Sequence, residues 1–478
     1  MAAMARHARH PGRAARPAPE GGETGLGFSA NVVRHLIAPL WEHRDGIAYR
    51  SHLRFLERSQ FWGAEELARY RRDRLNRILR HAHVHVPFHR RRLDTAGYDP
   101  AREWDIADLR RLPVLEKEDI RGRQSSLIAT DADQASLRRK RTGGSTAVPL
   151  RVAIDPEGWN RKYAATWRHN RWAGFEPGEW LGLVWGNEPP PEGIRAKLRR
   201  FTYERFFALD TLHMTEANMQ RFLAECRERK TRFLMGHAHS VYLLADFCRR
   251  CAVRDVAFDG VITSAMVLRP AERTVIEEVF AAEVFDRYGC EELSIIASEC
   301  ERHEGLHLHA EGLIAEVLAG GEPAPDGTFG DLVLTDLVNM GMPLLRYRVG
   351  DVAAVHPEPC ACGRGLPRLT EIRGRTADFL HTPEGNRVFG ISVLDTMMIH
   401  IEGIRQTQIV QNRIDELIVR LAVDPERFGA HGEAELRREL PKYFGPRMHY
   451  RFEFVERIAP EPNGKYRFAV CNLPEAGT

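Results

Sequence analysis

The sequence has no uninterrupted apolar run that approaches the ~20 residues of a membrane-spanning helix. Its continuous apolar stretches, such as residues 181–186 and 314–318, have the length of buried strands. Neither sign of charge dominates, because 69 Lys and Arg face 66 Asp and Glu and leave a net charge of +3. We therefore expect no transmembrane segment. We also expect no nucleic-acid partner, since the arginines beyond the N-terminal tail are dispersed among acids.

Cysteine is scarce as well. Eight cysteines are spread unevenly over 478 residues, which is unlike a disulfide framework and predicts a reduced, cytoplasmic protein. The composition is otherwise that of a globular protein, with 43% hydrophobic and 28% charged residues. The length allows roughly two to four domains.

The N-terminus lacks acids before Glu20 but carries four arginines in its first sixteen residues. No apolar core of a signal peptide follows. We predict that residues 1–27 form a disordered basic tail, and Arg-rich targeting is the alternative.

Residues 141–150 read Arg-Thr-Gly-Gly-Ser-Thr-Ala-Val-Pro-Leu. The glycines allow a tight turn, and successive N–H groups with neighbouring hydroxyls can form a nest for phosphate. The residues of this predicted phosphate loop are Thr142, Gly143, Gly144, Ser145 and Thr146. The loop has no Walker lysine, and it joins two predicted strands (136–141 and 149–154) rather than a strand and a helix. An ordinary polar hairpin turn is the alternative.

After this loop, strands and helices alternate in the way that is typical of α/β layers. The pattern predicts strands at 180–185, 233–235, 260–263 and 283–285 and helices at 217–229, 240–251 and 270–280. Antiparallel strands are predicted at 332–335 and 344–347. Beyond about residue 379 the order βαββαβ predicts a small separate α+β domain, with helices at 392–400 and 433–443 and strands at 407–411, 417–422 and 450–455.

Three further clusters combine glycine with charged side chains. In residues 286–292, Asp-Arg-Tyr-Gly-Cys-Glu-Glu, a strand is predicted to end in a glycine turn with carboxylates, where ligands bind in α/β sheets. In residues 346–351, Arg-Tyr-Arg-Val-Gly-Asp, a carboxylate after a glycine turn could accept two ribose hydroxyls. In residues 461–467, Lys465 lies on a glycine turn that could deliver a cation into a distant cleft.

Cysteine and histidine are grouped at three places. Cys300, His303 and His307 precede Cys360-x-Cys362 by some sixty residues, and two thiolates with Cys and His would suit a tetrahedral Zn²⁺. Reduced core cysteines are the alternative. The histidine-rich run 81–89 is interpreted as a helix end rather than a metal site, because Pro87 follows a predicted helix at 63–83. The C-x-x-C spacing at 248–251 lies within a predicted helix and is interpreted as incidental.

Together these motifs resemble the adenylate-forming enzymes, in the branch of phenylacetate–CoA ligase and the CapK-like (coenzyme F390 synthetase-like) proteins. The resemblance covers about residues 61–470 and includes Tyr-Gly-x-x-Glu (288–292), Tyr-Arg-x-Gly-Asp (347–351), Gly-Arg-x-x-Asp (374–378) and Gly-Lys (464–465). It implies an α/β fold with a large multi-layer N-terminal adenylation domain (28–373). A hinge (374–378) would join this to a small C-terminal α+β domain (379–478) that carries the catalytic lysine.

The resemblance also implies residue roles. Ser145 and its neighbours would hold the phosphates of ATP, and Tyr288 with Gly289 would contact adenine. The remaining roles are Mg²⁺ binding by Glu292, ribose binding by Asp351, nucleotide binding by Arg375 next to hinge residue Asp378, and contact of Lys465 with the α-phosphate and the substrate carboxylate. Some relatives hold zinc in the region of Cys300, His307, Cys360 and Cys362, and His303 is the alternative nitrogen ligand.

The implied activity is ATP-dependent, AMP-forming ligation of a carboxylic acid to a thiol, with CoA as the expected cosubstrate. The alternatives are transfer to an amine and a non-catalytic binding protein. Three departures from the family pattern bear on this choice: Ala147 replaces a glycine, residues 264–266 (Ser-Ala-Met) lack a glutamate, and Glu291 stands beside Glu292. The acid pocket is expected near Trp185, His237 and Ala265. Trp185, His237 and His239 hint at an aromatic or polar acid, but core packing explains these three residues equally well.

Overall fold

The computed structural model describes residues 29–141, 150–186, 190–375, 379–389, 393, 401–461 and 466–473. Four predicted features therefore lie outside the described residues: the phosphate loop Thr142–Thr146 with Ala147, hinge residue Asp378, Lys465 and, except for residue 393, the helix predicted at 392–400. The tail 1–27 lies outside them as well. Among the residues described, no helix is both long and apolar enough to cross a membrane.

The N-terminal part is helical. The long predicted helix is present as α4, which ends at His85 one residue before Val86 takes an extended conformation and Pro87 begins the next helix. Proline fits this position because the first turn of a helix needs no N–H from it. The elements are α1 Ala30–Val32, η1 Val33–Ile37, α2 Ala38–Arg44, α3 Arg50–Ser59, α4 Ala64–His85, α5 Pro87–Thr95, η2 Ile106–Arg111 and α6 Lys117–Leu127.

The stem of the glycine-rich loop is a two-stranded antiparallel sheet, β1 Arg138–Arg141 and β2 Arg151–Ile154, which confirms the predicted strand–loop–strand setting. Asp155 then caps helix α7 (Pro156–Trp172) by accepting a hydrogen bond from the Gly158 N–H. The capping acid followed by proline is the helix-start pattern that the sequence contains.

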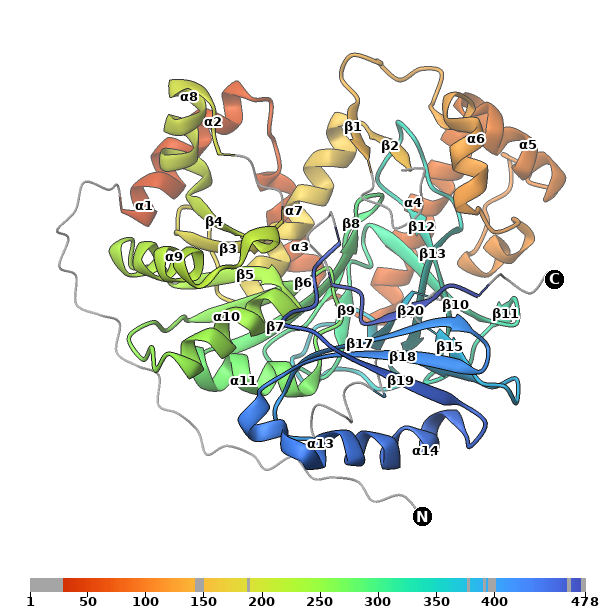
Figure 1. Cartoon of the computed structure of the whole chain (residues 1–478). Coiled ribbons are helices and arrows are strands. Elements are labelled where there is room, and N and C mark those ends of the chain that lie inside the picture. Colours follow the sequence, from red (N-terminus) through yellow and green to blue (C-terminus); the bar gives the residue numbers. More distant parts are fainter. Residues whose placement is uncertain are drawn as a thin grey trace.

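A twelve-stranded sheet with the order β11-β10-β12-β13-β14-β9-β8-β7-β6-β5-β3-β4 forms the centre of the molecule (Figure 1). Strands β4, β3, β5, β6 and β7 are parallel, and the strands from β8 to β11 pair antiparallel. The strands are β3 Leu181–Trp185, β4 Phe206–Asp210, β5 Phe233–His237, β6 Gly260–Ser264, β7 Glu283–Cys290, β8 Ser294–Ser298, β9 Leu306–Leu308, β10 Leu313–Ala319, β11 Glu322–Pro323, β12 Gly330–Asp336, β13 Tyr347–Val355 and β14 Arg368–Arg375.

Both faces of the parallel half are buried. Leu234 of β5 joins the apolar cluster of the helices on one face, whereas Phe233 and Met235 join the cluster on the other. This alternation follows from the two-residue repeat of a strand. The helices that share the cluster with Leu234 are α9 Glu216–Glu228, α10 Ala238–Arg250 and α11 Pro270–Phe280. The other helical elements of this part of the chain are α8 Gly193–Arg199, η3 Arg200–Glu204 and η4 Thr211–His213.

Two sequence predictions about glycine turns are wrong. Strand β7 does not end before Tyr288-Gly289 but continues through both residues to Cys290, and Gly289 packs so tightly that an added Cβ would lie 2.5 Å from the Ser294 carbonyl oxygen. Gly350 likewise lies inside β13, at φ +90° next to a register shift, so it forms a bulge rather than a turn. The strand predicted at 344–347 begins only at Tyr347.

The C-terminal part has its own sheet and core, which confirms a separate small α+β domain. Its four-stranded sheet has the order β19-β18-β17-β20, and a second pair, β15-β16, precedes it. The predicted order has one strand before its first helix, where the structure has the pair β15-β16, and it lacks β20; each of these three strands is only three residues long. The elements are β15 Phe379–His381, β16 Arg387–Phe389, β17 Ile404–Arg413, β18 Glu416–Val423, α13 Pro425–Glu439, α14 Pro441–Phe444, β19 His449–Phe454 and β20 Ala469–Cys471.

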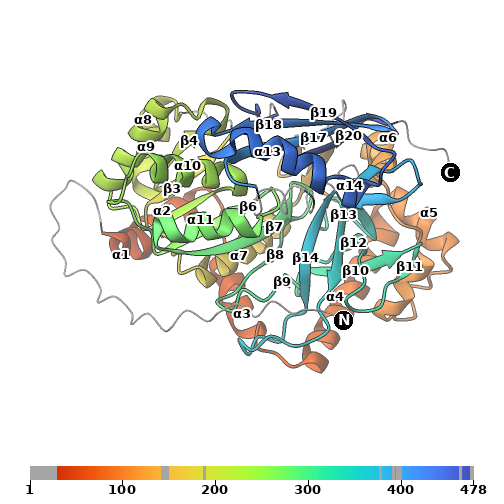
Figure 2. The same ribbon diagram turned by 60° about the horizontal axis from the view of Figure 1, so that its bottom comes forward.

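The C-terminal sheet lies beside α10 and α11 of the large domain, and both views show this contact (Figures 1 and 2). Leu243 of α10 and the loop residues Met266 and Val267 pack against the apolar core of the C-terminal domain. The loop after β6 therefore contributes to the interface between the two domains.

Candidate functional site

Two of the predicted motifs face each other across the large sheet. The Tyr288 hydroxyl of β7 donates to Asp351 Oδ2 of β13 at 2.6 Å, and the Tyr347 hydroxyl of β13 donates to Glu292 Oε1 at 2.9 Å. Burial and the Asp351 carboxylate raise the pKa of the Tyr288 hydroxyl well above its usual value, so it stays a donor. The structure thus joins the Tyr-Gly-x-x-Glu and Tyr-Arg-x-Gly-Asp motifs into one group.

The adjacent acids Glu291 and Glu292 have different surroundings. Glu292 is buried and accepts the hydrogen bond from Tyr347, whereas the exposed Glu291 forms an ion pair with Lys140 Nζ at 3.2 Å. Lys140 belongs to β1, which leads directly into the glycine-rich loop. Glu291 therefore ties the β7–β8 hairpin to the stem of that loop, and Glu292 is the acid that shares a cluster with the two tyrosines.

A cation that sequence reasoning did not select lies beside this group. A Cβ placed on Gly350 would lie 3.0 Å from Lys117 Nζ, so the lysine at the start of α6 reaches across the bulge next to Asp351. Only the fold reveals this approach, because the two residues are far apart in the sequence. Arg375 is paired in register with Asp351 across β13 and β14, which places the predicted ribose acid next to the predicted hinge.

The three residues expected near the acid pocket come together at the carboxyl ends of parallel strands. The rings of Trp185 (β3) and His237 (β5) lie 4.2 Å apart, and His237 pairs in register with Ser264 of β6. Ala265, the next residue, has a positive φ of 66°, which is uncommon for a residue with a Cβ. Strained backbone at this edge is consistent with a ligand site.

Asp286 is a second residue that sequence reasoning did not assign. Its Oδ1 accepts a hydrogen bond from the Thr263 hydroxyl at 2.8 Å, and its backbone N–H donates to Glu299. Burial, followed by the nearby Glu299 carboxylate, raises the pKa of Asp286 to about 7. A carboxyl group that titrates near neutrality thus lies two residues from Tyr288.

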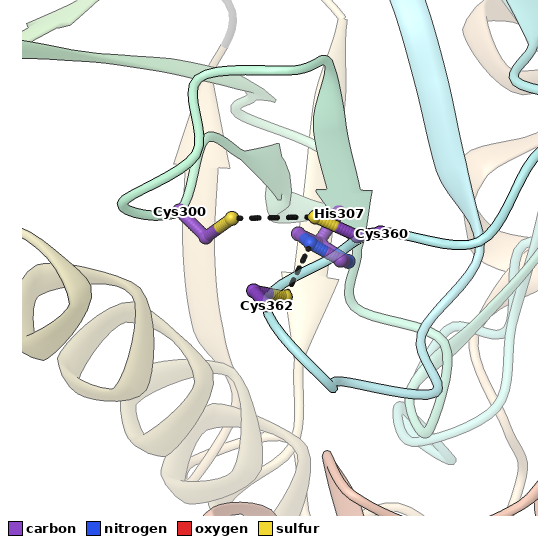
Figure 3. A group of neighbouring side chains, drawn as sticks. All are labelled: Cys300, His307, Cys360 and Cys362. Carbon is purple, nitrogen blue, oxygen red and sulfur yellow. Dashed lines mark hydrogen bonds between the residues drawn. The ribbon is translucent and has the colours of Figure 1, made fainter.

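The predicted metal ligands Cys300, His307, Cys360 and Cys362 converge on one point (Figure 3). Their ligand atoms all lie within 4.8 Å of one another, with Cys300 Sγ 3.8 Å from Cys360 Sγ and His307 Nε2 3.4 Å from Cys362 Sγ. His307 Nδ1 donates to the Leu366 carbonyl, which leaves Nε2 directed at the thiols. Three sulfurs and one imidazole nitrogen form a donor set that fits tetrahedral Zn²⁺.

The alternative ligand His303 is not among the four converging side chains, and its Nδ1 is hydrogen-bonded to Glu299 Oε2 at 3.1 Å. In the histidine-rich run, His81 and His85 lie one helical turn apart near Asp131, and the ligand atoms of the three side chains lie within 4.8 Å of one another. His81 Nε2, however, is hydrogen-bonded to the Met340 carbonyl at 2.9 Å, which agrees with a structural role for the helix end.

Known proteins resemble this chain in sequence over most of its length. Residues 380–472 match the family described as CapK C-terminal domain. The chain is 27% identical to the phenylacetate–coenzyme A ligase of Thermus thermophilus over 80% of this chain and 83% of the relative. It is 24% identical to Protein CapK of Staphylococcus aureus over 77% and 81% of the two chains. The resemblance to this branch of adenylate-forming enzymes is confirmed.

Solved structures agree in fold. The crystal structure of 2-hydroxyisobutyryl-CoA ligase with 2-HIB-AMP in its postadenylation state superposes with a TM-score of 0.73 at 21% identity, over 87% of this chain and 92% of the other. The same ligase in its thioesterification state gives 0.59 over a similar share.

Proposed function

We propose that this protein is an AMP-forming ligase that activates a carboxylic acid with ATP and transfers the acyl group to CoA. The observation that carries the proposal is the joining of Tyr288, Asp351, Tyr347 and Glu292 in one cluster at the end of the parallel strands. The relatives named as CoA ligases span most of the chain and support the same chemistry.

The residues of the cluster suit the parts of a nucleotide. Asp351 keeps one carboxylate oxygen beyond its bond with Tyr288 and can accept a ribose hydroxyl, and the Tyr288 ring offers a flat face for adenine. Glu292 would hold Mg²⁺, because a carboxylate oxygen is the ligand that this ion prefers, and the ion would supply positive charge near the phosphates. The loop 142–146 is proposed to bind the phosphates.

Two half-reactions follow from this assignment. The substrate carboxylate attacks the α-phosphorus of ATP, which forms acyl-AMP and releases pyrophosphate. The thiol of CoA then attacks the acyl carbon, loses its proton, and releases AMP. Lys465 would stabilise the charge that develops in the first step, and movement at residues 374–378 would withdraw it before the second.

We also propose that Cys300, His307, Cys360 and Cys362 hold a structural Zn²⁺. The four side chains connect Cys300 after β8 and His307 on β9 with the loop before β14, and four protein ligands would leave a tetrahedral ion no open position for a substrate. The ion would cross-link these segments and would take no part in the reaction.

Pyrophosphate release tests the proposed activity. Purified protein is incubated with ATP, Mg²⁺ and a panel of acids that includes phenylacetate and 2-hydroxyisobutyrate, with and without CoA. We expect acid-dependent pyrophosphate release and an acyl-CoA product. Release that yields amides with amines but no acyl-CoA would favour the amine acceptor, and an absence of release with every acid would favour a non-catalytic protein.

A further inference from the structure

Three buried, hydrogen-bonded side chains cross the contact between the two domains. His239, in the first turn of α10, donates from Nδ1 to Glu272 Oε1 of α11 at 2.5 Å. On the other side of the ring, Gln406 Nε2 of β17 donates to His239 Nε2 at 3.2 Å. All three side chains are buried, so the bond between Gln406 and His239 links the domains in a setting from which water is excluded.

The protonation states of Glu272 and His239 agree with the hydrogen bonds that link them to Gln406. Although burial opposes ionisation, Arg269 and His239 hold the pKa of Glu272 down to about 2, so Glu272 is a carboxylate. Burial lowers the pKa of His239, so the imidazole is neutral, with its proton on Nδ1 and an acceptor at Nε2. Gln406 cannot turn its amide without loss, because its Oε1 accepts the Ile458 N–H at 3.0 Å.

Two aromatic residues of the C-terminal domain complete the contact. The rings of Tyr466 and Phe468 lie 4.7 and 4.8 Å from the His239 ring in edge-on arrangements. The Arg269 guanidinium lies 4.4 Å from the centre of the Phe468 ring. Tyr466 is the residue directly after Lys465 in the sequence.

We propose that Gln406, His239 and Glu272, with Tyr466 and Phe468 over the imidazole, form a latch that holds the C-terminal domain for the adenylation step. His239 is a positioning residue, since it contacts Tyr466 and Phe468 and not the reacting atoms. This inference rests on the proposed function. The latch must open for the second half-reaction, because its two halves belong to different domains and a rotation of one domain separates them.

The location of the latch adds a link to the acid pocket. His239 follows His237 by two residues at the carboxyl end of β5, and the loop residues Met266 and Val267 pack against the C-terminal core directly after Ala265. An acid bound at this edge therefore lies against the same segments that hold the C-terminal domain, which couples occupation of the pocket to closure of the latch.

Hydrogen exchange tests the latch without any substrate. The variant Gln406→Leu removes the bond to His239, and Gln411→Leu is the matched control, since Gln411 lies on the same strand but bonds His381 within the C-terminal domain. We expect Gln406→Leu to speed amide exchange on the other side of the interface, at residues 239–243 and 265–267, whereas Gln411→Leu speeds it only near His381. If the amides of residues 265–267 exchange at the same rate in Gln406→Leu as in wild type, the proposed latch is wrong.

The two half-reactions then test its role. With an acid that wild type adenylates, Gln406→Leu should slow acid-dependent pyrophosphate release about fivefold to tenfold, the loss expected for one buried hydrogen bond. Thioester formation from supplied acyl-AMP and CoA should not slow. Phe468→Leu should show the same split. Equal losses in both steps would contradict a positioning role, and failure of wild type to adenylate any acid would instead remove the proposed function.

Discussion

Tyr288 donates a hydrogen bond of 2.6 Å to Asp351, although 63 residues separate them in the chain. The bond fixes the orientation of the carboxylate that we assign to the ribose, because one of its oxygens is already occupied. The Asp351 side chain is therefore preorganised, and less conformational entropy is lost when a ligand binds to it.

The first prediction concerns this carboxylate. Asp351→Ala should raise KM for ATP by about tenfold to 100-fold, since hydrogen bonds to a charged group contribute about 1.5–3 kcal/mol each. Steady-state kinetics with varied ATP measure the change. Asp331→Ala is the control, because Asp331 lies on the neighbouring strand β12 and pairs with Arg348 at a partly exposed position. Equal effects of the two variants would contradict a nucleotide role for Asp351.

The second prediction separates Glu292 from Glu291. Glu292→Gln should raise the Mg²⁺ concentration needed for half-maximal activity, because the amide keeps the bond with Tyr347 but lacks the charge that the ion requires. Glu291→Gln should have little effect, since its pair with Lys140 is exposed and such pairs contribute about 0–1 kcal/mol. A larger effect from Glu291→Gln would reverse the assignment.

The third prediction concerns zinc. Metal analysis of the purified protein should find one zinc per chain, and Cys360→Ser should lower both the zinc content and the melting temperature. His303→Ala should keep the metal, because His303 is not one of the four converging side chains. His81→Ala alters the second group, His81, His85 and Asp131, and should also keep the zinc. Wild-type protein without stoichiometric zinc contradicts the site.

The fourth prediction is a pH dependence. The pKa of Asp286 is raised to about 7, so between about pH 4 and pH 7 the folded state binds more protons than the unfolded state. The contribution of Asp286 to the free energy of unfolding is therefore greatest near pH 4 and falls as the pH rises to about 7. Asn resembles the neutral acid, so the stability of Asp286→Asn relative to wild type should increase from pH 4 to pH 7 and then level off. Urea unfolding at several pH values measures this difference, and a difference that is constant with pH contradicts the raised pKa.

The fold could be predicted where local pattern decides structure. The apolar runs of β3 and β10, the Asp155-Pro156 start of α7 and the helix α11 all appear in the sequence as strong periodic or capping patterns. The errors at Tyr288-Gly289 and Gly350 have a physical cause. Glycine also occurs inside strands where backbones approach closely or a bulge forms, and only the partner strand, distant in sequence, distinguishes this from a turn.

The candidate site was predictable to the extent that its residues form motifs. Glu292, Asp351 and the four cysteine and histidine ligands were selected from spacing and resemblance, and the structure brings them together in the two expected groups. Lys117 and Gln406 were not selected, Asp286 was quoted only as the first residue of the cluster 286–292, and His239 was named only as a hint of the acid pocket. The role of each depends on a contact across the fold that the sequence does not show.

The assignment of Lys465 gives the most direct test of the proposed chemistry. Acid-dependent exchange of labelled pyrophosphate into ATP reports adenylation alone, without CoA. Wild type should show exchange that requires the acid, and Lys465→Ala should lose about 100-fold or more of that rate, the loss typical when one stabiliser of transition-state charge is removed. No exchange by wild type with any acid, or full exchange by Lys465→Ala, would contradict the account.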